Sequence, residues 1–150
     1  MTTQAHHEAT SAPAPAPAPT HGTQRRLRLP FDAAVLALPA ALKAEGFGVI
    51  TEIDLAATFK AKLGVDFRKY RIFGACNPTL AHRALGHDLS VGVLLPCNVV
   101  LYEGDDGVVT VGAVDPTQTL GGGADDPELA ALARDVGERL SRVLAALAAA

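Results

Sequence analysis

Residues 98–114 read NVVLYEGDDGVVTVGAV, and this stretch is the strongest indication of the fold class in the sequence. Two runs rich in β-branched and aromatic residues, 98–102 and 108–114, flank the Gly-Asp-Asp-Gly segment at 104–107. Such runs favour strands, and a short connection rich in glycine and aspartate is typical of a hairpin turn. The stretch therefore predicts an antiparallel pair of strands. The apolar run at 91–95 is expected to add a further strand to this meander.

Three more strands are expected upstream of the meander. Arg and Leu alternate over residues 24–29, as in a half-buried strand, and residues 69–75 form the third expected strand. In the second, the side chains expected to share one face are Phe47, Val49, Thr51 and Ile53. Together the patterns predict an α+β domain. Its antiparallel or mixed sheet of about five to six strands is expected to carry helices mainly on one face.

Helix start and stop signals lie between the expected strands. Asp54 is expected to cap a helix that ends at Gly64, and Asn77 followed by Pro78 opens another that ends at Gly86. An earlier helix begins near Phe31 and ends at Gly46. Pro39, inside that first helix, is expected to kink or restart it, because proline removes a hydrogen bond of the helix interior.

A long amphipathic helix is expected at the C-terminal end of the chain. Asp126 and Pro127 start it, and its apolar residues recur at steps of three and four. These residues are Leu129, Leu132, Val136, Leu140, Val143 and Leu147. The stripe is expected to pack on the sheet of its own chain. The alternative is that part of it meets another subunit, because the helix exceeds the length that a small sheet needs.

Composition limits the classes of protein to which the chain can belong. The 150 residues are 49% apolar and 19% charged, as in one globular domain, and the formal net charge is -3. An acidic balance argues against nucleic acid or an anionic membrane surface as the main partner. No uninterrupted apolar run is long enough for a membrane helix, and the first residues lack the basic and apolar parts of a secretory signal. We therefore expect a cytoplasmic protein.

The N-terminal residues differ in composition from the rest of the chain. Alanine and proline alternate over residues 12–19, and little in residues 1–23 could be buried to offset the entropy of ordering them. We expect a disordered Ala/Pro-rich tail at 1–23 and a folded domain at 24–150. We expect the histidines of this tail to be solvated and not to form a metal site; they are His6, His7 and His21.

Two short segments place a Cys-Asn pair at the end or bend of an expected strand. One reads GACNP at 74–78 and the other LPCNV at 95–99. Further segments complete a pattern together with these two: GFGV at 46–49, EID at 52–54, KLG at 62–64, Tyr70 and Asp115-Pro116. With this pattern, residues 24–147 resemble the DUF302 family. The resemblance implies a fold, a homodimer and the place of a site. It implies no reaction, because the family is biochemically uncharacterised.

Cys76 and Cys97 are the residues best able to carry chemistry. Cys76 immediately precedes a helix N-terminus, where unpaired backbone N–H groups stabilise an anion. Pro96 before Cys97 interrupts strand pairing and favours a bulge or turn that aims the side chain toward a cleft. If the two strands are neighbours, the two sulfurs can approach each other. The candidate ligand-binding or redox residues are Cys76, Asn77, Cys97, Asn98, Glu52 and Tyr70.

Three functions fit these candidates, and neither a reaction nor a cofactor follows from the sequence. The first is a binding module for a small molecule or a soft metal ion, with Cys76 and Cys97 as metal ligands and His82 or His87 as further ones. The second is a thiol-dependent redox enzyme that uses the two cysteines. The third is a structural or oligomeric interaction protein without a chemical site, in which both thiols are buried small side chains.

Two clusters of charged residues have a structural and a chemical interpretation. Glu52 and Asp54 share a strand face, which suits a general acid and base or a hard metal ion, but Asp54 is sufficiently explained as a helix cap. Cations gather at Lys60, Lys62, Arg68, Lys69 and Arg71. They could receive an anionic ligand. A solvated face is the expectation, because no glycine-rich phosphate loop accompanies them.

Overall fold

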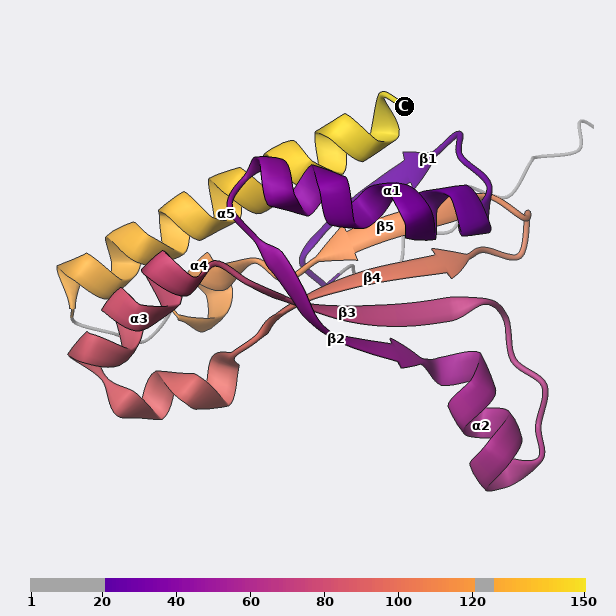
Figure 1. Ribbon diagram of the computed structural model, residues 1–150, viewed down its shortest axis with the longest axis horizontal. Coiled ribbons are helices and arrows are strands. Elements are labelled where there is room, and N and C mark those ends of the chain that lie inside the picture. Colours follow the sequence, from indigo (N-terminus) through magenta and orange to yellow (C-terminus); the bar gives the residue numbers. More distant parts are fainter. Residues whose placement is uncertain (1–20, 121–125) are drawn as a thin grey trace, which may run out of the picture.

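Five antiparallel strands form one sheet, in the order β1-β5-β4-β3-β2 (Figure 1). The computed structural model describes residues 21–120 and 126–150, so most of the expected tail at 1–23 lies outside the described residues. The strands are β1 (Thr23–Leu27), β2 (Gly48–Asp54), β3 (Tyr70–Cys76), β4 (Cys97–Glu103) and β5 (Val109–Ala113). The predicted hairpin is confirmed, because β4 and β5 pair directly on either side of the Gly104–Gly107 turn.

Helices pack mainly on one face of this sheet, as predicted. They are α1 (Phe31–Ala44), α2 (Leu55–Leu63), α3 (Pro78–His87), α4 (Pro116–Thr119), α5 (Pro127–Ala148) and the 3-10 helix η1 (Leu89–Leu94). In Figure 1, α1 and α5 lie across the upper face of the sheet, α3 and α4 stand at one end, and α2 projects at the other. Among the described elements, none covers the opposite face of β3, β4 and β5. The α+β fold class is therefore confirmed.

The core lies between the covered face and the two long helices. Alternation along β3 and β4 places Phe73, Ala75, Val99 and Leu101 on that face, and all four are buried. The whole predicted stripe of α5 is buried as well. Its apolar residues therefore pack within their own chain, and none is left exposed for another subunit.

The predicted caps are confirmed at three helix starts. Ala57 N donates to Asp54 Oδ1 at 3.0 Å, Leu80 N donates to Asn77 Oδ1 at 3.2 Å, and Glu128 N donates to Asp126 Oδ1 at 2.9 Å. Each bond satisfies one backbone donor that the first helical turn leaves unpaired. The caps fix where α2, α3 and α5 begin.

Two expectations about the strands are wrong. Residues 91–95 form no strand, because η1 occupies most of them and Asp88 Oδ1 accepts from Ser90 N at 2.8 Å to start that helix. The second strand does not keep one face, because a bulge between Val49 and Thr51 shifts the register against β3. Val49 pairs with Ala75 on the covered side and Thr51 pairs with Gly74, so the alternation reverses after the bulge.

Pro39 lies inside α1, which the structure describes as one helix from Phe31 to Ala44. Of the expected kink or restart, the restart does not occur. Among the described residues, no helix is long and apolar enough to cross a membrane.

Candidate functional site

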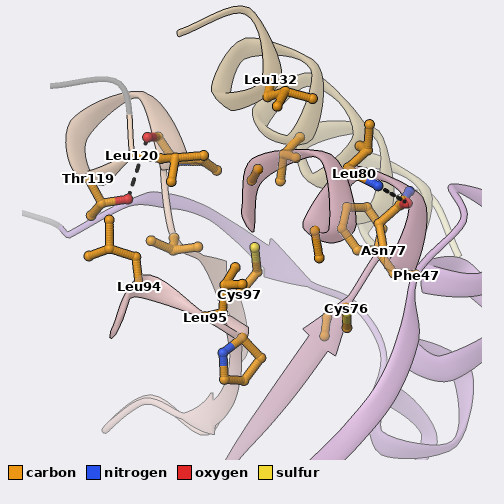
Figure 2. Close-up of a pocket in the computed structure, with 17 residues that line it drawn as sticks. Phe47, Cys76, Asn77, Leu80, Leu94, Leu95, Cys97, Thr119, Leu120 and Leu132 are labelled. Atoms are coloured by element: carbon orange, nitrogen blue, oxygen red, sulfur yellow. Dashed lines mark hydrogen bonds between the residues drawn. The ribbon is translucent and has the colours of Figure 1, made fainter. Parts of the chain in front are cut away.

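Five of the six candidate residues fall into two concavities on opposite sides of the sheet. We call the first the thiol pocket; Cys76, Asn77 and Cys97 line it at the end of β3 and the start of β4 (Figure 2). We call the second the sheet groove; Tyr70 and Asn98 line it on the uncovered face. Glu52 lines neither. The expected single site is thus divided between two places.

The thiol pocket is small and almost entirely apolar. It has a volume of about 50 Å³, and apart from Cys76, Asn77, Cys97 and Thr119 its lining residues are all hydrocarbon. Helices α3, α4 and α5 and the end of η1 contribute these walls. A space of this size holds only a few non-hydrogen atoms. The pocket therefore suits the end of a ligand and not a whole drug-sized molecule.

Cys97 contributes the sulfur in the centre of this pocket. It is the first residue of β4 and pairs with Ala75, so it faces the helix-covered side of the sheet. Figure 2 shows its side chain directed into the pocket. Burial raises the pKa of the Cys97 thiol to about 11, and the charge of nearby Cys76 contributes to the rise. Cys97 is therefore an uncharged thiol at neutral pH.

Cys76 lies on the neighbouring strand at the wall of the same pocket. It is the last residue of β3 and stands one position beyond Ala75, the partner of Cys97. Alternation therefore directs the two side chains toward different faces, although both residues line the pocket and both are free thiols. Neither is sealed in the core, since both are only partly buried. Both residues thus line one pocket, and a site that uses both sulfurs stays a prediction.

Asn77 has a structural task in the pocket wall. Only 9% of the residue is exposed, and its side chain accepts the capping bond from Leu80 N. Gly46 lies directly against it: a Cβ at Gly46 would come within 2.9 Å of Asn77 Nδ2. Gly46 also has φ +84°, a conformation that glycine adopts without strain. Asn77 thus fixes the start of α3 beside Cys76.

The sheet groove lies on the uncovered face across β1, β5, β4 and β3, and its volume is about 480 Å³. Tyr70 and Tyr102 form its aromatic part, with ring centroids 5.2 Å apart and planes 8° from parallel. Burial raises the pKa of Tyr70, and the charge of Tyr102 raises it further. Asn98 lies here because it follows Cys97 on the same strand, so alternation turns it to the other face.

Glu52 is held in an ion pair away from both concavities. Arg71 Nη1 lies 2.5 Å from Glu52 Oε1, and Arg71 Nη2 lies 3.8 Å from Asp54 Oδ2. Glu52 and Asp54 thus lie on either side of the Arg71 guanidinium, which occupies the space that a ligand of the two carboxylates would need. Three more cations of the predicted basic cluster also pair with acids: Lys60 with Asp66, Arg68 with Asp105 and Lys69 with Asp32. These pairs favour the interpretation of the cluster as a solvated face.

Neither histidine proposed as a metal ligand lines the thiol pocket. His82 is exposed on α3. The ring of His87 instead contacts the start of α5, with Nδ1 3.3 Å from Asp126 Oδ2 and Nε2 2.5 Å from Glu128 Oε2. Over residues 21–120 and 126–150, no three His, Cys, Asp or Glu side chains gather as a metal site would need. Metal binding by the two cysteines stays a prediction.

Sequence reasoning missed Tyr102, Gln24 and Thr119. Tyr102 faces Tyr70 because the two residues are direct partners in the β3–β4 register. Gln24 Oε1 accepts from Tyr102 Oη at 3.4 Å. Thr119 lines both concavities. The expected strands already contained Tyr70 and Tyr102, but only the register brings their rings together.

Comparisons with known proteins agree with this fold. A family model described as domain of unknown function DUF302 matches residues 23–147. The chain is also similar to the crystal structure of an uncharacterized conserved protein DUF302 from Bacillus stearothermophilus. The two share 32% sequence identity and a TM-score of 0.77, and the match covers 83% of this chain and 96% of that one. No match to a curated protein was found.

Proposed function

We propose, from the premise that this chain belongs to the DUF302 family of unknown function, that it is a binding module for a small ligand at the thiol pocket. The observation that carries the proposal is the Cys97 thiol, which is uncharged and directed into walls of hydrocarbon. An apolar group that enters such a pocket gains favourable burial, while the thiol offers a weak donor and a polarisable contact.

The size of the pocket limits the ligand. About 50 Å³ accommodates a branched alkyl end of a few carbon atoms, so the rest of the molecule stays at the mouth. Thr119 is the exposed polar residue of the pocket lining. The proposed ligand therefore has an apolar end and a polar remainder.

The test uses isobutanol as the probe and amide chemical shifts of the full chain as the readout. We expect saturable shifts at Cys97 and Leu80 in the wild type. Ala81→Leu adds a side chain at a half-buried pocket position on α3 and should abolish them. The matched control Ala40→Leu makes the same change at an exposed position of α1 that does not line the pocket. Loss of binding in both variants, or in neither, contradicts the proposal.

A soft metal ion is the alternative occupant of the same pocket. Two cysteines on its wall would supply two thiolate ligands, which suit Cu(I) or Zn²⁺. Binding must then displace a proton from Cys97, whose thiol is uncharged at neutral pH. Competition of the full chain against a chromophoric Cu(I) chelator tests this: stoichiometric uptake that is lost in Cys97→Ser supports it, and no uptake excludes it.

Thiol redox chemistry is the second candidate function, and two free cysteines on one pocket wall favour it. Formation of a Cys76–Cys97 disulfide would release two electrons and two protons to a disulfide oxidant such as oxidised glutathione. With a pKa of about 11, Cys97 is a thiolate in roughly one molecule in ten thousand at pH 7, so Cys76 would have to be the attacking thiol. A cytoplasmic location, which would keep both thiols reduced, stays a prediction.

Mass spectrometry after equilibration with oxidised glutathione separates these functions. A loss of the mass of two hydrogen atoms from the full chain supports formation of the Cys76–Cys97 disulfide. Unchanged mass, together with no binding of isobutanol or Cu(I), leaves the structural role as the answer.

We also propose a homodimer through the uncovered side of the sheet near β2 and α2. Helix α2 has no buried residue, and Ile53, Leu63 and Phe67 near it are 44%, 68% and 45% exposed. Such large apolar side chains favour an interface when they lie together. Light scattering should give twice the mass of the chain for the wild type and the single mass for Leu63→Glu. A monomeric wild type refutes the dimer.

A further inference from the structure

The sheet groove begins at the point where the described chain begins. His21 and Gly22 line it together with Gln24 of β1. Gly22 has φ +68°, and a Cβ there would lie 2.0 Å from the Ala113 carbonyl oxygen, so the backbone passes in close contact with β5. The described part of the chain thus begins at the edge of the groove.

The groove combines ring faces with hydrogen-bonding side chains. The stacked rings of Tyr70 and Tyr102 form its far part. Asn98 and Gln118 add amide groups, and Thr119 adds a hydroxyl. Grooves of this composition recognise polyproline II segments, since proline rings pack on aromatic faces and the free backbone carbonyls accept hydrogen bonds from polar side chains.

The segment directly before the groove has the complementary composition. Residues 12–19 read APAPAPAP, with proline at every second position. Proline fixes φ near the polyproline II value and has no N–H to satisfy, so such a segment loses little entropy when it binds. Pro19 is only two residues from His21, which itself lines the groove.

We propose that the Ala/Pro-rich segment 12–19 binds in the sheet groove of its own chain. Its reach is sufficient: eight residues of polyproline II extend about 25 Å, whereas the groove crosses three strand spacings from β1 to β3, about 14 Å. Covalent continuity favours this occupant over a free partner, because a short tether gives a high effective concentration. The family model begins at residue 23, so this contact is a property of this chain beyond its family domain.

Binding of segment 12–19 in the sheet groove would also affect the thiol pocket. Val114 and Thr119 line both concavities, so the bound segment would lie against the wall that they share. The proposal does not depend on the proposed ligand-binding function.

Tyrosine fluorescence tests the proposal, since the chain has no tryptophan and its two tyrosines both lie in the groove. The test variant is the full chain with Pro13→Gly, Pro15→Gly, Pro17→Gly and Pro19→Gly, which keeps the length and removes the conformational preference. We expect a higher acrylamide quenching constant in this variant, and amide shift changes at Gln24, Asn98 and Gly112. The control carries Ala12→Ser, Ala14→Ser, Ala16→Ser and Ala18→Ser, keeps all four prolines, and should match the wild type.

A second arm adds a synthetic peptide of residues 8–20 to the Pro→Gly variant and should restore the protection of the tyrosines. Protection in the wild type should not change on dilution, because the contact lies within one chain. Protection that falls on dilution in step with dissociation of a dimer assigns the groove to a second copy and overturns the proposal. Equal quenching and equal shifts in the wild type and the Pro→Gly variant overturn it as well.

Discussion

Gly74 lies directly against the ring of Pro96: a Cβ added at Gly74 would come within 2.8 Å of Pro96 Cγ. The same Cβ would lie 2.1 Å from Thr51 Oγ1 on the other neighbouring strand. This contact joins the two Cys-Asn segments of the sequence, since Gly74 precedes Cys76 by two residues and Pro96 immediately precedes Cys97. The absence of a side chain at Gly74 therefore allows the start of β4 to approach β3 closely enough for both cysteines to line one pocket.

Gly74→Ala should destabilise the fold by about 1–3 kcal/mol, the usual cost of an extra methyl group in a packed region. The Thr51 hydroxyl can rotate away, but the Pro96 ring cannot, so the strain should reach Cys97. Urea unfolding measures the loss of stability, and the amide shift of Cys97 reports the displacement. Thr51→Ala in the Gly74→Ala background should recover only part of the stability. Full recovery would show that Pro96 is not the obstacle.

The Cys97 thiol should make stability depend on pH in the alkaline range. Burial is the main reason why its pKa rises from 9.0 to about 11 in the fold. The folded state therefore holds this proton at pH values where the unfolded chain releases it, and the stabilisation is complete below about pH 9 and lost as the pH rises toward about 11. A rise of this size corresponds to at most about 3 kcal/mol.

The measurement is urea unfolding of the wild type and of Cys97→Ser across that range. The difference between their unfolding free energies should be constant below about pH 9 and shrink above it. A difference that stays constant to the end of the range would mean that the thiol ionises in the fold as easily as in the open chain.

The fold was largely predictable because its signals are local. Asp54, Asn77 and Asp126 each stand before a helical pattern and each accepts a capping bond. The hairpin between β4 and β5 follows from the Gly104–Gly107 turn. The error at residues 91–95 has a local cause too: periodicity alone does not tell a short apolar strand from a short apolar helix, and the local signal for η1 is the cap at Asp88.

The site was only partly predictable because it depends on register. That Cys97 is opposite Ala75 and not opposite Cys76 decides which face each thiol takes. The same register sends Asn98 to the sheet groove and the bulge after Val49 reverses β2. A shift of one residue reverses every side chain of a strand, and nothing in a single sequence measures that shift.

Glu52→Gln should leave ligand binding unchanged and cost less than about 1 kcal/mol, because its partner Arg71 is about one-third exposed and surface ion pairs contribute little. Added salt should reduce the difference in unfolding free energy between Glu52→Gln and the wild type. Isobutanol titration of the variant supplies the second readout. A large loss of isobutanol binding would show that Glu52 belongs to the binding site.

Tyr70 and Tyr102 should be energetically coupled through their stacked rings. Direct pairing in the β3–β4 register, ring centroids 5.2 Å apart and nearly parallel ring planes give the offset contact that aromatic pairs prefer. A double-mutant cycle with Tyr70→Leu and Tyr102→Leu should yield a coupling of about 0.5–1.5 kcal/mol in urea unfolding, since leucine keeps the apolar bulk and removes the ring. Ile72 and Val100 form the adjacent direct pair on the same face and serve as the control. Truncation of both to alanine should give a smaller coupling, because two aliphatic side chains lack the ring interaction. Equal coupling in the two pairs would show that burial alone, and not stacking, holds the tyrosines together.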